Sequence, residues 1–159
     1  MPATSDSADG HLTTIERVAA LHRVDLFATV PGRVLAAVAR TLTETIVAAG
    51  APVITAGALE DHLFVIVSGR VGVHHGEYPL GELGAGTTVG ELAALVPEPR
   101  SVSVTALEDT RLLRLDKPVL DELLADRPEL AQGIIAALVT RLRSRRAPTA
   151  AAGAVARPS

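Results

Sequence analysis

The chain has 159 residues, 48% apolar content and a formal net charge of −3, which fit one globular domain and argue against a protein that coats nucleic acid or a membrane surface. It contains no cysteine, which excludes disulfides, thiolate nucleophiles and cysteine-ligated zinc. Aromatic residues make up 2% and tryptophan is missing, so the chain lacks the stacking surfaces that bind single-stranded nucleic acid.

The N-terminal part is predicted to be helical after a short tail. Residues 1–12 are polar and lack the apolar core of a signal peptide, so we expect a disordered tail there. Thr13 and Glu16, a hydroxyl residue followed by glutamate three positions later, form the pattern of a capping box and predict a helix over residues 14–21. Pro31 suits the first turn of a second helix, in which apolar residues recur at helical spacing.

From about residue 43 the pattern changes to short β-branched runs separated by glycines. Many short strands divided by turn residues are typical of an all-β sandwich or barrel. No apolar run reaches the ~18 residues that a transmembrane helix needs, so we expect no membrane insertion. The expected strands are Thr45–Val47, Val53–Thr55, Leu63–Val67, Arg70–His74, Tyr78–Leu80, Ser101–Ala106 and Thr110–Leu115.

Two helices are predicted after the last strand. Asp116 can cap the first helix, with Pro118 in its first turn. The last 13 residues, 147–159, are rich in alanine and proline and are expected to be a disordered tail. One folded domain is therefore expected over residues 13–146. Its second helix, reaching about residue 146, is predicted from apolar residues four apart: Leu130, Ile134, Leu138 and Leu142.

The most informative stretch lies within the β region, at residues 80–104. Gly90 and Glu91 stand at the start of a short apolar helical segment, and Arg100 follows nine residues after Glu91. Free backbone N–H groups at a helix start attract a phosphate, and an arginine can grip two phosphate oxygens at once. A carboxylate can accept a hydrogen bond from a sugar hydroxyl. The layout suits a small anionic ligand that carries a hydroxyl, with an ion pair between Glu91 and Arg100 as the structural alternative.

This stretch resembles the phosphate-binding cassette of cyclic nucleotide-binding domains, the cAMP- and cGMP-sensing modules of the catabolite activator protein, protein kinase regulatory subunits and gated channels. The matching segments are residues 89–95 and 99–104, which keep the family's spacing between glutamate and arginine. An upstream pattern of glycines and apolar residues, over residues 50–69, matches as well. The resemblance covers about residues 13–146.

The resemblance implies a mainly β fold with flanking helices, a double-stranded β-helix jelly roll with N-terminal helices and two C-terminal helices. Two positions depart from the family pattern: Val89 replaces the usual phenylalanine, and Val102 replaces a small alanine beside the phosphate site, which crowds the pocket. The ligand-binding residues that the resemblance implies are Gly90, Glu91, Leu92, Ala93, Arg100 and Ser101.

The function implied is that of a cytoplasmic regulatory module that senses cAMP or cGMP through motion of its C-terminal helices and passes the signal to another protein. A small hydroxyl residue such as Ser101 occurs at this position in both cAMP and cGMP binders, so it does not indicate which base is bound. Thr140 and Ser144 are either lid residues over the base or solvated helix positions. No cofactor other than the ligand is expected.

No catalytic or metal-binding set is visible in the sequence. A Gly-x-Ser-x-Gly elbow and a Cys–His pair are both missing, so no enzyme is predicted. His74 and His75 are adjacent and would point to opposite faces of a strand, and His62 has no partner at ligand spacing, which argues against a metal site. A basic run suits either a helix C-terminus or contact with nucleic acid or lipid; it comprises Arg141, Arg143, Arg145 and Arg146.

Two other hypotheses stay open. The first is a ligand-free interaction domain that forms homodimers through a short heptad-like seam on the last helix, comprising Ala131, Ile135, Leu138 and Leu142. The second is a transcription factor of the catabolite activator type. The chain after residue 146 is too short for a helix-turn-helix domain, so direct DNA binding is not expected.

Overall fold

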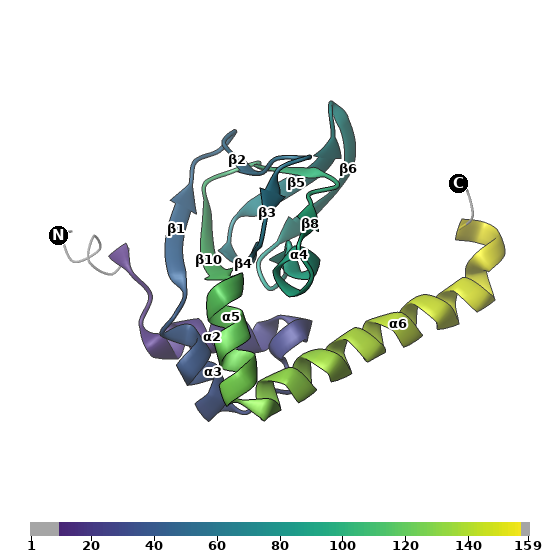
Figure 1. Ribbon diagram of the computed structural model, residues 1–159. Coiled ribbons are helices and arrows are strands. Elements are labelled where there is room, and N and C mark those ends of the chain that lie inside the picture. The colour runs from purple at the N-terminus through teal and green to yellow at the C-terminus, as the bar shows by residue number, and fades with distance from the viewer. Residues whose placement is uncertain (1–9, 157–159) are drawn as a thin grey trace.

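The computed structural model describes residues 10–156, in which helices pack at one end of a β-sandwich (Figure 1). One four-stranded sheet has the order β1-β10-β4-β7, the other has the order β2-β9-β5-β6, and β3 and β8 form a two-stranded ribbon. All strand pairs are antiparallel. The mainly β jelly roll with flanking helices is thereby confirmed. The strands are β1 (Thr43–Val47), β2 (Pro52–Ile54), β3 (Leu59–Glu60), β4 (His62–Ser68), β5 (Arg70–His75), β6 (Tyr78–Gly84), β7 (Thr88–Val89), β8 (Glu98–Pro99), β9 (Ser103–Ala106) and β10 (Thr110–Asp116).

Strand β4 is buried on both faces, because it lies between the inside of the roll and the helices. Successive side chains of a strand point to opposite faces. Phe64 and Ile66 belong to the cluster of buried residues inside the roll, and Leu63 and Val65 belong to the cluster beneath the helices. This placement explains why the sequence of β4 reads as a continuous apolar run rather than as an alternating one.

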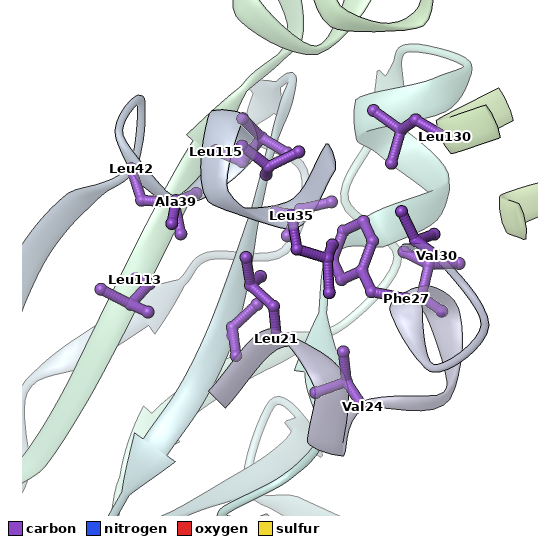
Figure 2. Close-up of a cluster of buried hydrophobic side chains, with 14 of the residues drawn as sticks. Leu21, Val24, Phe27, Val30, Leu35, Ala39, Leu42, Leu113, Leu115 and Leu130 are labelled. Atoms are coloured by element: carbon purple, nitrogen blue, oxygen red, sulfur yellow. The ribbon is translucent and has the colours of Figure 1, made fainter. Parts of the chain in front are cut away.

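The N-terminal helices cover the outer face of β4 and β10. Helix α2 (Thr14–Arg23) has the predicted capping box, with Thr13 and Glu16 bonded reciprocally, and ends two residues later than expected. A 3-10 turn, η1 (Asp25–Phe27), leads to α3 (Gly32–Ala39). Figure 2 shows how side chains from these helices meet the sheet; the labelled residues are Leu21, Val24, Phe27, Val30, Leu35, Ala39, Leu42, Leu113, Leu115 and Leu130.

Three further helices follow in the chain. Helix α4 (Glu91–Leu95) is short and lies between β7 and β8, and α5 (Lys117–Asp126) follows β10. Helix α6 (Pro128–Ala156) begins against η1 and then projects away from the body (Figure 1). Gly133 sets how closely α6 approaches, because a Cβ at this position would lie 2.5 Å from Val30 Cγ2.

The structure differs from the sequence-based expectation at both predicted tails. The N–H of Leu12 donates to the Glu44 carboxylate (2.8 Å), so the packed structure begins before residue 13. Residues 147–156 are helical, and six of these ten are alanine, the residue with the highest helix propensity. Residues 1–9 and 157–159, the remaining parts of the two expected tails, lie outside the described residues.

Strand assignments differ at the shortest elements. The ribbon of β3 and β8 was not predicted, since two-residue strands are too short to show a period in the sequence. Strand β9 begins at Ser103 rather than Ser101, which leaves Arg100, Ser101 and Val102 in the loop that precedes it.

Within residues 10–156, no helix combines the length and the apolar character required to cross a membrane.

Candidate ligand-binding site

A cavity of about 280 Å³ opens beside α4, between the inner face of the roll and the segment from β8 to β9. A mostly apolar cavity with a few convergent polar groups is the usual form of a small-molecule site. The apolar lining residues are Ile54, Val73, Leu83, Val89, Ala93, Pro99, Val102 and Val104, and the remaining ones are Thr88, Gly90, Glu91, Glu98, Arg100 and Ser101.

Gly90 connects β7 to α4 and has a backbone conformation that other residues rarely adopt. Its φ is +83°, in the left-handed region that favours glycine. A Cβ at this position would lie 2.7 Å from Arg100 Nη1 and 3.0 Å from the His62 carbonyl oxygen. The missing side chain therefore lets the chain turn into α4 while the guanidinium of Arg100 lies directly against it.

Replacing Gly90 by alanine should both strain the backbone and displace the Arg100 side chain. The left-handed conformation alone costs a residue with a Cβ about 1–2 kcal/mol, so we expect the free energy of unfolding to fall by at least that amount. Urea unfolding of G90A followed by circular dichroism measures the loss. Gly76 provides the control, since its φ is also positive but a Cβ there would meet nothing within 4 Å. If G90A were no less stable than G76A, the close approach of Arg100 to Gly90 would make no contribution to the loss of stability.

Arg100 is buried, with 7% of its surface exposed, and its guanidinium is fixed in the cavity wall. Its Nη2 donates to the His62 carbonyl (2.7 Å), Nη1 donates to the Gly90 carbonyl (3.4 Å) and Nε donates to Glu60 Oε1 (3.4 Å). Each terminal nitrogen carries two hydrogens, and within residues 10–156 each is bonded to one carbonyl. A buried cation needs hydrogen-bonding partners, and the remaining N–H groups suit an anion in the cavity.

Glu91, the first residue of α4, faces the cavity and pairs with an arginine from the far end of the chain. Glu91 Oε2 accepts from Arg141 Nη1 (2.8 Å). Arg141 also binds Asp25 through two bonds, from Nε to Oδ2 (2.9 Å) and from Nη2 to Oδ1 (2.7 Å). The hydrogen bond from Arg141 holds the pKa of the Asp25 carboxyl below its ordinary value. The ion pair between Glu91 and Arg100, offered as the structural alternative, is not formed, since each residue has another partner.

The structure brings together five of the six predicted binding residues. Gly90, Glu91, Ala93, Arg100 and Ser101 all line the cavity. Leu92 lies in the first turn of α4, where backbone N–H groups have no acceptor within the helix. The first bond of α4 runs from the N–H of Ala94 to the carbonyl of Gly90 (3.3 Å).

The two predicted lid positions lie elsewhere. Thr140 and Ser144 are exposed on α6 and do not belong to the cavity lining, so their role as lid residues stays a prediction.

His74, one of the histidines considered as metal ligands, bonds to the Gly76 carbonyl and the Thr105 hydroxyl. Among the described residues no group of three or more potential ligands is placed to hold a metal ion.

Sequence reasoning missed three residues that hold the site in place: Glu60, Asp25 and Arg141. Arg141 was visible only as one member of the basic run, and its sequence position does not separate it from Arg143. Asp25 precedes the buried Leu26 and Phe27, so the sequence offered an acid next to apolar residues without indicating its partner. Burial lowers the pKa of His62, whose carbonyl holds Arg100.

The model of the cyclic nucleotide-binding domain family matches residues 44–127. The chain is 38% identical over 111 residues to a cyclic nucleotide-gated potassium channel of Rhizobium etli, covering 70% of this chain and 31% of the channel. It is 30% identical over 128 residues to a CRP-like cAMP-activated global transcriptional regulator of Mycobacterium tuberculosis, covering 77% and 57%.

Solved structures agree with these matches. The crystal structure of the N-terminal domain of a transcriptional regulator from Streptomyces coelicolor A3(2) superposes with a TM-score of 0.74 at 30% identity, covering 79% of this chain and 94% of that domain. The chain thus spans nearly the whole of that domain, but only about a third of the channel and just over half of the mycobacterial regulator.

Proposed function

As the chain belongs to the cyclic nucleotide-binding domain family, we propose that it is a regulatory module that binds cAMP or cGMP in the cavity beside α4. The observation that carries the proposal is the buried guanidinium of Arg100 in the wall of a mostly apolar cavity. A cyclic nucleotide offers one anionic phosphate for this guanidinium and a base for the apolar lining. The Rhizobium and mycobacterial relatives are both named for cyclic nucleotides, which supports this class of ligand.

In the proposed complex Arg100 binds the phosphate, together with the backbone N–H groups of residues 90–92. Ser101 lies next to Arg100 in the lining and adds a hydroxyl to the same side of the cavity. Glu91 accepts a hydrogen bond from the free ribose hydroxyl. The half-buried Val102 also lines the cavity and leaves less room beside the phosphate than an alanine would.

The C-terminal helices are the proposed switch, with a separate effector protein as the receiver of the signal. Helix α6 is linked to the cavity through Arg141 and Glu91, so a ligand that contacts Glu91 also affects how α6 is held. A ligand shifts such an equilibrium only by its difference in affinity for the two arrangements, ordinarily about 1–3 kcal/mol. Thr140 and Ser144 would reach the base only if α6 moved over the cavity.

Thermal unfolding with and without cAMP, and then cGMP, tests the proposal. A ligand at 100 times its dissociation constant adds about 2.7 kcal/mol to stability, which in a domain of this size raises Tm by roughly 5–10 °C. We expect that rise for at least one of the two nucleotides and a smaller one for adenosine or guanosine, which lack the phosphate. Unchanged Tm values with both cyclic nucleotides at millimolar concentration would reject the sensor.

A second candidate function, that of a dimerisation domain, is favoured by the exposed apolar face of α6. Ile135, Val139 and Leu142 are 60%, 39% and 55% exposed and lie on one face at helical spacing. The predicted seam is altered at one position, because Leu138 packs partly against the core instead. Sedimentation of the wild type and of Leu142→Glu, each with and without nucleotide, distinguishes the two candidate functions. A wild-type dimer whose stability does not change with nucleotide, and which dissociates in Leu142→Glu, would favour the dimerisation domain.

A further inference from the structure

Lys117, the first residue of α5, bonds to the end of a different helix. Its Nζ donates to the carbonyl of Leu95, the last residue of α4 (3.3 Å), and to Asp121 Oδ1, one turn later in α5 (3.1 Å). The two helices lie in contact with each other (Figure 1). The Lys117 side chain is 23% exposed, so the ammonium group donates to both acceptors while it is partly shielded from water.

The position of this lysine is unfavourable for α5 but suitable for α4. A cation in the first turn of a helix opposes the helix dipole, and an ion pair between positions i and i+4 is weaker when the lysine precedes the acid. The C-terminal carbonyl groups of a helix, by contrast, have no partner within the helix and favour a positive charge. The bond to Leu95 is therefore the contact that accounts for a lysine at this position.

Helix α4 depends on contacts with other elements because it has only five residues. A helix of that length is not stable by itself in water. The side chains of Ala93 and Ala94 are buried, but an alanine removes little apolar surface from water, so their burial stabilises α4 less than larger side chains would. Gly90, Glu91 and Ala93 line the cavity, so the contacts that anchor α4 also set the shape of the cavity.

The backbone of Lys117 holds a second part of the cavity wall. Its N–H donates to the carbonyl of Asp61 (3.0 Å). Asp61 lies between Glu60 and His62, which both accept hydrogen bonds from the guanidinium of Arg100. Lys117 thus bonds to both of the segments that place α4 relative to Arg100.

We propose that Lys117 is a positioning residue for ligand binding, which keeps α4 against the wall that carries Arg100 without touching the ligand itself. The inference rests on the proposed function. Lys117 does not belong to the cavity lining, so it acts by keeping α4 in the arrangement that binds the nucleotide. When such an arrangement is only partly populated, the apparent affinity falls by the same fraction. Loss of the ammonium group should consequently weaken the binding of cAMP and of cGMP by the same factor.

Isothermal titration calorimetry of the wild type and of Lys117→Met with cAMP and cGMP, together with amide hydrogen exchange of a peptide that spans α4, tests the inference. Methionine has a similar length but no donor and no charge. We expect the affinity for each nucleotide that the wild type binds to fall by about fivefold, as for one charged contact at a partly exposed helix end. In the ligand-free variant, α4 should exchange faster by about the same factor. Both effects should be small in Lys117→Arg, which keeps a charged donor for Leu95.

Asp121→Asn separates the two contacts of the ammonium group. It removes the ion pair within α5 but leaves the bond to Leu95, so affinity and exchange should both stay near the wild-type values. Circular dichroism at the titration temperature verifies that each variant is folded. If Lys117→Met does not fold, Lys117→Gln, which removes the charge but keeps a polar side chain, takes its place.

The remaining outcomes each refute a distinct statement. Unchanged affinity in folded Lys117→Met would show that Lys117 has no part in binding, and a loss for only one of two nucleotides that bind would mean that it contacts the base. A loss of affinity without faster exchange would refute the anchoring of α4, and an equal loss in Asp121→Asn would assign the effect to the ion pair within α5. A wild type that binds neither nucleotide would reject the proposed function, while the exchange of α4 would still decide whether Lys117 anchors this helix.

Discussion

Arg100→Ala should lower the affinity for a cyclic nucleotide by at least about a hundredfold. Charge-assisted hydrogen bonds contribute about 1.5–3 kcal/mol each, and a guanidinium binds a phosphate through two of them. The effect is large because the guanidinium is buried and already oriented by the carbonyls of His62 and Gly90. Calorimetric titration of the folded variant with cAMP and cGMP measures the loss.

The conservative variant Arg100→Lys distinguishes charge from geometry. Lysine keeps the positive charge but cannot donate to two carbonyls and a phosphate in one plane, so an intermediate loss of affinity is expected. Removing Arg100 also leaves the carbonyls of His62 and Gly90 and the Glu60 carboxylate without this donor, so the unfolding transition of each variant must be recorded first. Nearly wild-type affinity in folded Arg100→Ala would show that the phosphate binds elsewhere.

Glu44→Gln should lower the free energy of unfolding by about 3–5 kcal/mol, the usual result of removing one partner from a buried ion pair. The Glu44 side chain is 4% exposed and accepts from Arg17 (3.4 Å), from Arg111 and from the N–H of Leu12 (2.8 Å). Its loss leaves two arginines without their carboxylate beneath the N-terminal segment. Urea unfolding of the wild type and of the variant gives the difference.

An exposed pair on the same sandwich is the control for Glu44. Arg70 and Glu108 are 3.0 Å apart, but both side chains are more than half exposed, and such pairs contribute about 0–1 kcal/mol. Glu108→Gln should accordingly change the free energy of unfolding by less than about 1 kcal/mol. Similar losses in the two variants would show that burial of Glu44 has no energetic consequence.

The stability that Glu44 contributes should depend on pH and should be lost in acid. Burial raises the pKa of the Glu44 carboxyl, but the N–H of Leu12 and the guanidinium groups of Arg111 and Arg17 outweigh burial and lower the pKa below 4.5, its ordinary value. A group whose pKa is lower in the folded state contributes stability above its ordinary pKa and loses that contribution as the pH falls through the folded value. The difference between the wild type and Glu44→Gln should therefore shrink below pH 4.5.

The residues of the cavity wall could be predicted because they are close in sequence. Gly90 and Glu91 are adjacent and Arg100 follows within ten positions, so one turn and one loop bring them together whatever the rest of the chain does. The partners of these residues could not be predicted in this way. Arg141 is 50 residues from Glu91 and 116 residues from Asp25, and their meeting depends on how α6 packs, which a run of similar arginines does not encode.

Composition was a poorer guide than local propensity at the C-terminal end. Alanine and proline together indicated a disordered tail after residue 146, yet α6 continues to Ala156. Proline in a helix interior removes one backbone bond, but Ala147 before Pro148 and the three alanines at positions 150–152 favour the helical conformation. Most strands were predicted to within two residues, because the alternation of half-buried and buried positions in β9 and the continuous apolar run of β4 follow from their surroundings.

Gly133, where α6 packs closely on Val30, lies near one end of this long helix, so a small rotation there would displace the other end much farther. Gly133 rests on Val30 at one end of α6, and the other end lies on the order of 30 Å away at 1.5 Å per residue. A rotation of ten degrees about that fulcrum would carry the far end through about 5 Å, although the packing at Gly133 itself would change by a fraction of that distance. In the proposed switch, slight repacking of Val30 would thereby be amplified into a displacement of several ångströms at the far end of the helix.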